Sequence, residues 1–365
     1  MELGAYFHFP YCQRCCAYCD FFKKPLEADA NQNFKRYLAK IMAKVPPFLQ
    51  EQPRKLDSIY FGGGSPSLAD AELIKFLADF LHQHFPETDF AAAEITLEVN
   101  PEDLPTLAWN AWRDLGVNRV SLGLQSAHPV FRQKLGRRFK QDDWDRFIAQ
   151  LQRQQLPYSF DLLLGLPFGQ RDLAAEIAWI LGYQPQHLSA YILTPPPRWP
   201  WPAVEEEQVV AEFLQVDEQL TKAQFQHYEI SNYALAGQQA RHNLKYWHLA
   251  PVVAFGPSAV GLVSWQGQWW RYRWPEDFSC DPQVEQLSAD ALALERLYLA
   301  WRLGEGVALA DHFPAAKITV IQGSLERYGQ DVALVDGRYH LTPRGMLRMD
   351  GLVVDLAKHL PHSKS

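Results

Sequence analysis

The sequence lacks a long hydrophobic run. No stretch approaches the roughly 20 apolar residues that a membrane-spanning helix requires, and the longest candidate, residues 252–263, is interrupted by Pro257 and Ser258. The first eleven residues contain no basic leader and no small-residue cleavage site, so a secretory signal is not expected. We therefore expect a cytoplasmic protein without a membrane span.

An excess of basic residues is also absent. Lys and Arg number 35 against 42 Asp and Glu, which gives a formal net charge of −7. Nucleic-acid binding needs a basic surface that neutralises phosphates, so this balance argues against a dedicated nucleic-acid partner. The 47% of hydrophobic residues excludes global disorder. A chain of 365 residues exceeds the usual size of one core, so a main domain and a smaller one are expected.

Cysteine is scarce, and its distribution does not suit disulfides. Cys12, Cys15, Cys16 and Cys19 lie within one short stretch, and Cys280 stands alone. A disulfide framework would spread its cysteines to close long loops, so the crowding indicates a metal or redox role. A zinc site and a thioredoxin-like C-x2-C pair both remain open. The C-x3-C-x2-C spacing of Cys12, Cys16 and Cys19 favours a [4Fe–4S] cluster with one iron left for another ligand.

The first two-thirds of the chain alternate between predicted strands and amphipathic helices. The predicted strands are residues 5–9, 58–61, 94–99, 119–123, 159–164 and 187–193. The predicted helices between and after them are residues 34–45, 73–81, 107–115, 144–151, 173–181 and 205–223. Such alternation predicts a parallel sheet covered by helices. Six units instead of eight predict a partial, open (β/α)6 barrel, with its chemistry at the carboxyl ends of the strands.

The pattern changes past about residue 285. Helices are predicted at 289–303 and 315–328, followed by a hairpin at 332–341 and a last helix that Thr342 caps. This order is typical of a winged-helix-like module. We therefore expect a barrel domain at 1–225, a connecting segment at 226–284 and a C-terminal, mainly helical, winged-helix-like domain at 285–365.

Several candidate site residues follow predicted strands. The run GGGSP at 62–66 lets a ligand approach the backbone closely, and no Lys-Ser/Thr follows it, so it is not a phosphate-binding P-loop. Glu98 and Gln125 end the third and fourth strands, and Arg137 follows in the next loop. Asp161 is a charge within an apolar strand and needs a partner. Taken alone, the glycines could form a simple tight turn, and Glu98 could cap a helix.

A second group of residues lies in the connecting segment. The runs YEISNY at 228–233, HNLKYW at 242–247 and GPSA at 256–259 place His242 among aromatic residues. From composition alone, a structural histidine is the default interpretation.

The run Y-x-H-x-P-x-C-x3-C-x-Y-C-D-F at residues 6–21 resembles the radical S-adenosylmethionine (SAM) loop. More narrowly, it resembles the oxygen-independent coproporphyrinogen III oxidase family and its haem-chaperone branch, and the resemblance extends to about residue 356. It implies a [4Fe–4S] cluster held by Cys12, Cys16 and Cys19, with SAM on the open iron. The SAM contacts it implies are Tyr6, Tyr18, Gly63, Gly64, Ser65, Glu98, Gln125, Arg137 and Asp161.

Two departures favour the haem-chaperone branch over the oxidases. Phe21 stands where the oxidase pattern has a fourth cysteine, and eleven residues precede Cys12 where the oxidases have a longer lead. The HNxxYW run is similar to that of the chaperones, in which the histidine is implicated in holding haem iron. The resemblance therefore implies His242 as an axial haem ligand, with Tyr246 beside the macrocycle.

The implied partners are haem or a porphyrinogen, a haem-recipient protein, and a one-electron donor of the flavodoxin or ferredoxin type. Peripheral contact with a membrane-bound recipient is also implied. Two other functions remain open. One is oxidative decarboxylation of coproporphyrinogen III to protoporphyrinogen IX through a 5′-deoxyadenosyl radical, so the residues leave enzymatic activity undecided. The other is a zinc or thiol-redox module.

Overall fold

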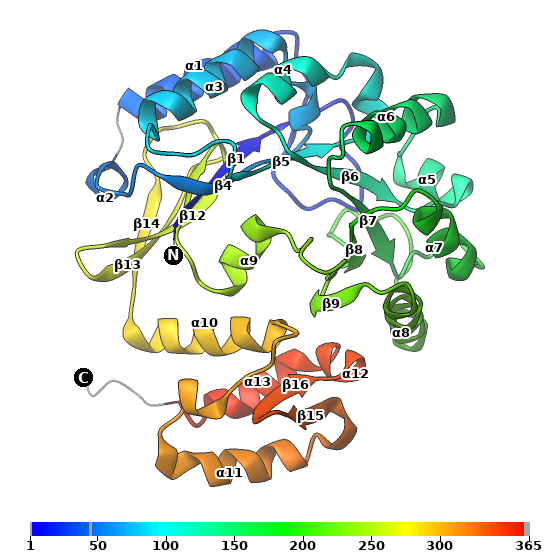
Figure 1. Cartoon of the computed structure of the whole chain (residues 1–365), viewed down its shortest axis with the longest axis vertical. Helices are drawn as coiled ribbons and strands as arrows, with labels where there is room; N and C mark the ends of the chain where they lie inside the picture. Colours follow the sequence, from blue (N-terminus) through cyan, green and yellow to red (C-terminus); the bar gives the residue numbers. More distant parts are fainter. Residues whose placement is uncertain (1, 44–45, 361–365) are drawn as a thin grey trace.

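The computed structural model describes residues 2–43 and 46–360, and its centre is a single large sheet (Figure 1). The sheet has twelve strands in the order β14-β13-β12-β11-β1-β4-β5-β6-β7-β8-β10-β9. Neighbours from β1 to β8 in this order are parallel. They are β1 (Leu3–Phe9), β4 (Leu56–Gly63), β5 (Glu94–Val99), β6 (Arg119–Gln125), β7 (Tyr158–Leu164) and β8 (His187–Ile192). The predicted six-stranded parallel sheet is therefore confirmed.

Helices cover the outer face of these six strands (Figure 1). They are α1 (Ala30–Ala43), α3 (Ala71–His84), α4 (Trp109–Leu115), α5 (Pro129–Leu135), α6 (Gln141–Arg153), α7 (Leu173–Gly182) and α8 (Glu206–Lys222). The short helix α2 (Pro47–Gln50) packs instead against β12 (Val260–Trp265). Their apolar stripes pack on alternate strand residues such as Phe7, Phe61 and Leu97 and form one large core. The end of the helix predicted at 34–45 lies outside the described residues. Short 3-10 turns, η1 (Pro66–Leu68) and η2 (Pro101–Thr106), follow β4 and β5.

Residues 226–284, expected to connect two domains, extend both edges of the sheet. The strands are β9 (Gln226–Glu229), β10 (Asn232–Ala234), β11 (Val252–Phe255), β12 (Val260–Trp265), β13 (Gln268–Arg273) and β14 (Gln283–Leu287). β11 adds a seventh parallel strand beside β1, and β12 to β14 continue antiparallel. β10 and β9 lie antiparallel beyond β8. The helix α9 (Arg241–Trp247) follows β10 and precedes β11 in the sequence, and it lies on the inner face of the curved sheet (Figure 1).

The C-terminal module has the predicted order of helices and hairpin. It contains α10 (Ala289–Arg302), η3 (Leu309–Asp311), α11 (Ala315–Glu326), η4 (Gly329–Asp331), β15 (Val332–Val335), β16 (Arg338–Leu341), α12 (Pro343–Met346) and α13 (Met349–Ala357). The Thr342 hydroxyl accepts a hydrogen bond from the Gly345 amide, as an N-cap does. A hydrogen-bonded ion pair between Arg302 and the fully buried Glu229 (2.9 Å) ties α10 to the sheet. Among the described residues, no helix is long and apolar enough to cross a bilayer.

Candidate functional site

Alternation along the parallel strands gives the barrel a polar interior. On β6, Val120 and Leu122 pack in the outer core, whereas Arg119, Ser121 and Gln125 face inward. The same alternation on neighbouring strands turns further polar groups toward a cavity of about 380 Å³, which we call the central cavity. The predicted residues that line it are Tyr18, Cys19, Gly63, Gly64, Glu98, Gln125, Arg137 and Asp161. Lining residues absent from the prediction include Tyr60, Asn100, Arg119, His187, Tyr191 and Asn243.

The cysteine loop lies at the mouth of this cavity. Two short strands, β2 (Tyr11–Cys12) and β3 (Lys24–Pro25), pair and close the loop at its base. Cys12 and Cys16 are buried, Cys19 is partly buried, and Cys15 is exposed. The loop is bound to the glycine run through the Ser65 amide, which donates to the Tyr11 carbonyl oxygen (2.8 Å). The fold therefore places the Cys12 sulfur next to the glycine run, and Cys19 lines the same cavity as Gly63 and Gly64.

The glycines are required by close packing. A Cβ atom on Gly64 would lie 2.8 Å from the Tyr11 carbonyl oxygen and 3.0 Å from the Cys12 sulfur. Gly63 has φ +111°, and its Cβ would lie 2.7 Å from the His8 ring. A side chain at position 64 would push the cysteine loop away from the sheet, and one at position 63 would collide with the His8 ring.

The three thiols match in number the protein ligands of a [4Fe–4S] cluster that leaves one iron open. Burial raises the pKa of Cys12 to about 12 and also raises that of Cys16, which the nearby Arg137 charge partly opposes. A bound metal would supply the positive charge that holds both as thiolates. In residues 2–43 and 46–360, no three His, Cys, Asp or Glu side chains converge to hold one metal ion. A [4Fe–4S] cluster binds each thiolate through a different iron, so three thiols around one loop fit it.

Glu98 joins the glycine run to the wall of the central cavity. Its carboxylate accepts hydrogen bonds from the Gly63 amide (3.1 Å) and the Tyr60 hydroxyl (2.8 Å). Burial, together with the neighbouring Asp161 charge, raises the pKa of Glu98 to about 7, against the hydrogen bonds from Tyr60 and Gly63. Burial also raises the pKa of Asp161 to about 6, against the hydrogen bonds from Ser189 and Ser121. A cationic ligand would favour the ionised form of both carboxyl groups, as the sulfonium and amino groups of SAM would.

Arg137 is held by residues that the sequence did not single out. Its buried guanidinium donates to Glu102 (2.7 Å) and to the Asn100 side-chain oxygen (2.6 Å), and the Asn100 amide donates to the Ser65 hydroxyl. The guanidinium lies 5.9 Å from the ring of Tyr18. Arg137 is therefore fixed between the glycine run, the cysteine loop and the central cavity.

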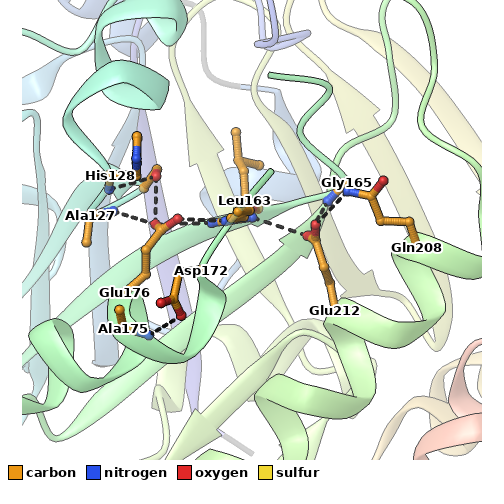
Figure 2. A network of polar contacts seen from close by, with 11 residues as sticks. Ala127, His128, Leu163, Gly165, Asp172, Ala175, Glu176, Gln208 and Glu212 are labelled. Atoms are coloured by element: carbon orange, nitrogen blue, oxygen red, sulfur yellow. Dashed lines mark hydrogen bonds and ion pairs between the residues drawn. The ribbon is translucent and has the colours of Figure 1, made fainter. Parts of the chain in front are cut away.

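A buried ionic network anchors the loops that follow β6 and β7 (Figure 2). Arg171 binds Glu176 (2.7 Å) and Glu212 (3.2 Å) and donates to the Leu163 carbonyl oxygen (2.7 Å). Glu176 in turn accepts from the Ser126 hydroxyl and from the next backbone amide. Ser126 directly follows Gln125, whose φ of 66° is left-handed. The network therefore holds the backbone at the carboxyl edge of the sheet, where Gln125 enters the cavity.

Two predicted SAM contacts lie outside the lining of the central cavity. Ser65 is buried beneath the glycine run, where it binds Asn100. Tyr6 lies on β1, and its hydroxyl is 3.0 Å from Nδ1 of His8. It borders a second, more open cavity of about 530 Å³, which we call the outer cavity. The outer cavity is lined by Tyr6, His8, Asp20, Phe21, Phe22, Lys23, Arg198, Tyr246, Ser258, Ala259, Val260, Arg273 and Glu276.

His242 lies in α9, against the inner face of the barrel. Its ring is 1% exposed, with Nδ1 3.0 Å from the Ser58 hydroxyl and Nε2 3.2 Å from the Tyr246 hydroxyl. The ring stacks on Tyr60 at 5.2 Å. Burial lowers the pKa of His242 to about 3, with a further contribution from the Lys245 charge, so the ring is neutral. His242 lines neither cavity, whereas Tyr246 lines the outer one.

The chain is similar in sequence to known proteins of one family. Residues 6–179 match the Radical SAM superfamily. The chain is 32% identical to the heme chaperone HemW of Haemophilus influenzae over 72% of this chain and 70% of that protein. It is 29% identical to the heme chaperone HemW of Synechocystis sp. over 91% of this chain and 88% of that protein.

A solved structure shares the fold over nearly the whole chain. Coproporphyrinogen III oxidase (HemN) from Escherichia coli, a radical SAM enzyme, matches with a TM-score of 0.79 at 17% identity. The match covers 98% of this chain and 91% of that one, and at this identity it shows the fold alone. From the family match and the extent of the identities, the chain belongs to the heme chaperone HemW family of the Radical SAM superfamily.

Proposed function

We propose that this chain is a haem chaperone that binds haem and passes it to a recipient protein. The observation that carries this proposal is the identity to heme chaperones over more than two-thirds of both chains. Phe21 supports it, because it replaces the fourth cysteine of the oxidase pattern. Its side chain is 71% exposed and borders both cavities. An exposed aromatic ring beside the loop offers a contact for a flat apolar ligand.

Cys12, Cys16 and Cys19 would hold a [4Fe–4S] cluster, and the central cavity would take SAM. When bound, the cluster and SAM would supply one-electron radical chemistry. The chain binds and orients these groups. Glu98 and the Gly63 amide would meet the amino end of SAM, and Tyr18, Gly64, Gln125, Arg137 and Asp161 would surround the rest of it.

The partners follow from the same assignment. Reduction of the cluster needs a one-electron donor of the flavodoxin or ferredoxin type, and delivery needs a haem-accepting protein, with peripheral contact if that protein sits in a membrane. The cytoplasm is the proposed site of action. Zinc binding and thiol-redox chemistry carry less weight, because Cys15, which completes the Cys12-x2-Cys15 pair, is exposed, whereas Cys12 is buried.

The test is a haemin titration of the anaerobically reconstituted full-length chain. A saturable shift of the Soret band at one haem per chain is expected. Absence of saturable binding, with the cluster shown to be present by iron and sulfide analysis, would overturn the proposed function.

A further inference from the structure

A basic surface joins the cysteine loop to the end of α5. Its residues Arg14, Lys134, Arg138 and Lys140 are exposed. None of the four forms an ion pair with another described residue. We call these four residues the basic face. The whole chain carries a formal net charge of −7, so the basic face is a local exception that would attract an acidic partner.

The basic face lies beside one of the predicted cluster ligands. The helix α5 ends at Leu135, and Gly136 follows it with φ +83°. A Cβ atom on Gly136 would lie 3.1 Å from Cδ of Arg14 and 3.9 Å from Sγ of Cys16. The other three residues of the basic face lie within four positions of Gly136 in the sequence. The unpaired cations therefore surround the point where the chain after α5 passes the Cys16 sulfur.

A groove of about 500 Å³ opens beside the basic face, and we call it the α5 groove. Its lining includes Arg138 and Lys140 of the basic face, together with Arg132 on α5. The Nη1 atom of Arg132 is buried and has no hydrogen-bond partner among the described residues. Glu176 acts on the charge of Arg132 from a distance but is itself paired with Arg171 at 2.7 Å. A carboxylate that enters the α5 groove would therefore meet unpaired cations, which bind it strongly.

The acidic residues nearby leave this positive charge in place. Both carboxylates that line the α5 groove are already paired, Glu102 with Arg137 at 2.7 Å and Asp143 with Arg146. Asp142, at the start of α6, is exposed and has no ion-pair partner in the described part of the chain. One unpaired carboxylate against the four cations of the basic face and Arg132 leaves a clear positive excess.

We propose that the basic face and the α5 groove are the docking surface of an acidic one-electron donor protein. This inference rests on the proposed function, which puts a [4Fe–4S] cluster in the cysteine loop and SAM in the central cavity. With SAM on the cavity side, a protein donor approaches the cluster from the outside, where Gly136 lies beside Cys16. One electron leaves the donor and the cluster gains it, and no bond of the chain forms or breaks. Such transient redox contacts bury little area and depend on complementary charge.

Complementary charge alone would also suit an anionic membrane or an acidic haem recipient. The position of the basic face favours the electron donor, because electron transfer requires the partner to come close to the cluster, whereas docking of a membrane or a haem recipient does not. The other two partners are therefore treated as outcomes of the test.

The experiment measures how an acidic flavodoxin binds the full-length chain, with and without the reconstituted cluster, and how fast reduced flavodoxin bleaches the cluster in anaerobic stopped flow. The double variant Arg138→Glu and Lys140→Glu should bind flavodoxin at low salt roughly tenfold more weakly or worse. Its cluster should be reduced more slowly by a similar factor. The matched control, Arg327→Glu with Arg344→Glu, changes exposed residues of the C-terminal module by the same charge and should stay within about twofold of wild type.

Two further measurements separate docking from damage to the cluster. Raising the salt concentration from about 0.05 M to about 0.3 M should shrink the difference between wild type and the Arg138/Lys140 variant, because salt screens exposed charges. Photoreduced deazaflavin, a small reductant that needs no docking surface, should reduce the cluster equally in both. Binding to the cluster-free chain gives a result that does not depend on the cluster, and melting curves check that each variant is folded.

The outcomes separate this inference from the proposed function. Equal affinity for flavodoxin in the Arg138/Lys140 variant and in the control would overturn the docking surface. Unchanged flavodoxin binding with lost binding to phosphatidylglycerol vesicles, or to a haem-accepting protein, would also overturn it and assign the basic face to that partner. A chain that takes up no cluster would overturn both proposals. Failure to bind haemin, with charge-dependent flavodoxin binding intact, would overturn only the proposed function.

Discussion

Gly64→Ala tests whether the glycine run sets the position of the cysteine loop. The new Cβ would lie 2.9 Å from the Phe9 carbonyl oxygen and 3.0 Å from the Cys12 sulfur, well inside the favourable range of about 3.5–4.0 Å. The obstacle includes backbone, which the Gly64 amide holds through a 2.7 Å bond to Phe9. Overpacking of this kind costs about 1–3 kcal/mol, and loss of the hydrogen bond about 1 kcal/mol more.

This cost is below the total stability of about 5–15 kcal/mol of a typical domain, so the variant should fold. The loop should shift instead, and we expect iron and sulfide content after anaerobic reconstitution to fall by at least half, with weaker SAM binding in equilibrium dialysis. Gly182→Ala is the matched control, because a Cβ there meets no atom within 4 Å at the end of α7. Iron content and SAM affinity in Gly64→Ala equal to those of wild type would refute the reasoning.

Three further predictions address the ligands, the ionic network and the cavity carboxylates. Cys16→Ser should abolish the cluster while the exposed Cys15→Ser retains it; the reverse iron contents would exclude the proposed ligand set. Arg171→Leu leaves two buried carboxylates unpaired and should lower the free energy of unfolding, measured in urea, by about 3–5 kcal/mol. The control Lys222→Ala removes an exposed ion pair and should lower it by about 0–1 kcal/mol. Equal losses of stability in the two variants would contradict the stabilising role of the network. Because burial raises the pKa of Glu98 from 4.5 to about 7, the folded cluster-free chain retains a proton that the unfolded chain releases. Its stability should therefore fall by up to about 3 kcal/mol as the pH rises through that window, and an equally steep fall in Glu98→Gln would contradict this.

The six parallel strands could be predicted because their core-facing residues are apolar and helices separate them. The added strands could not be assigned in the same way. β11 is only four residues long, and it pairs with β1 at the start of the chain, far away in the sequence, with Val252 opposite Gly4. The β12–β13 hairpin did leave a local signal. Gln266 and Gly267 both have positive φ between aromatic, alternating strands, which is the backbone of a tight hairpin turn.

The sequence also indicated most of the central cavity but not its supporting contacts. Glu98 and Asp161 could be found as charges on apolar strands, whereas the pairing of Arg137 with Glu102 depends on how two loops meet. The HNxxYW run indicated a special role for His242, but only the packing of α9 shows both ring nitrogens hydrogen bonded. The types and spacing of side chains in the sequence predict the chemistry that they can perform. The fold determines which neighbouring groups each side chain contacts.

The central claim, a radical SAM scaffold whose cargo is haem, is tested most directly by anaerobic incubation with coproporphyrinogen III. The reconstituted chain receives SAM and a low-potential reductant, and protoporphyrinogen formation is measured against the cluster content. The account predicts little or no protoporphyrinogen. Repeated turnover to protoporphyrinogen would contradict it and assign the chain to oxidative decarboxylation.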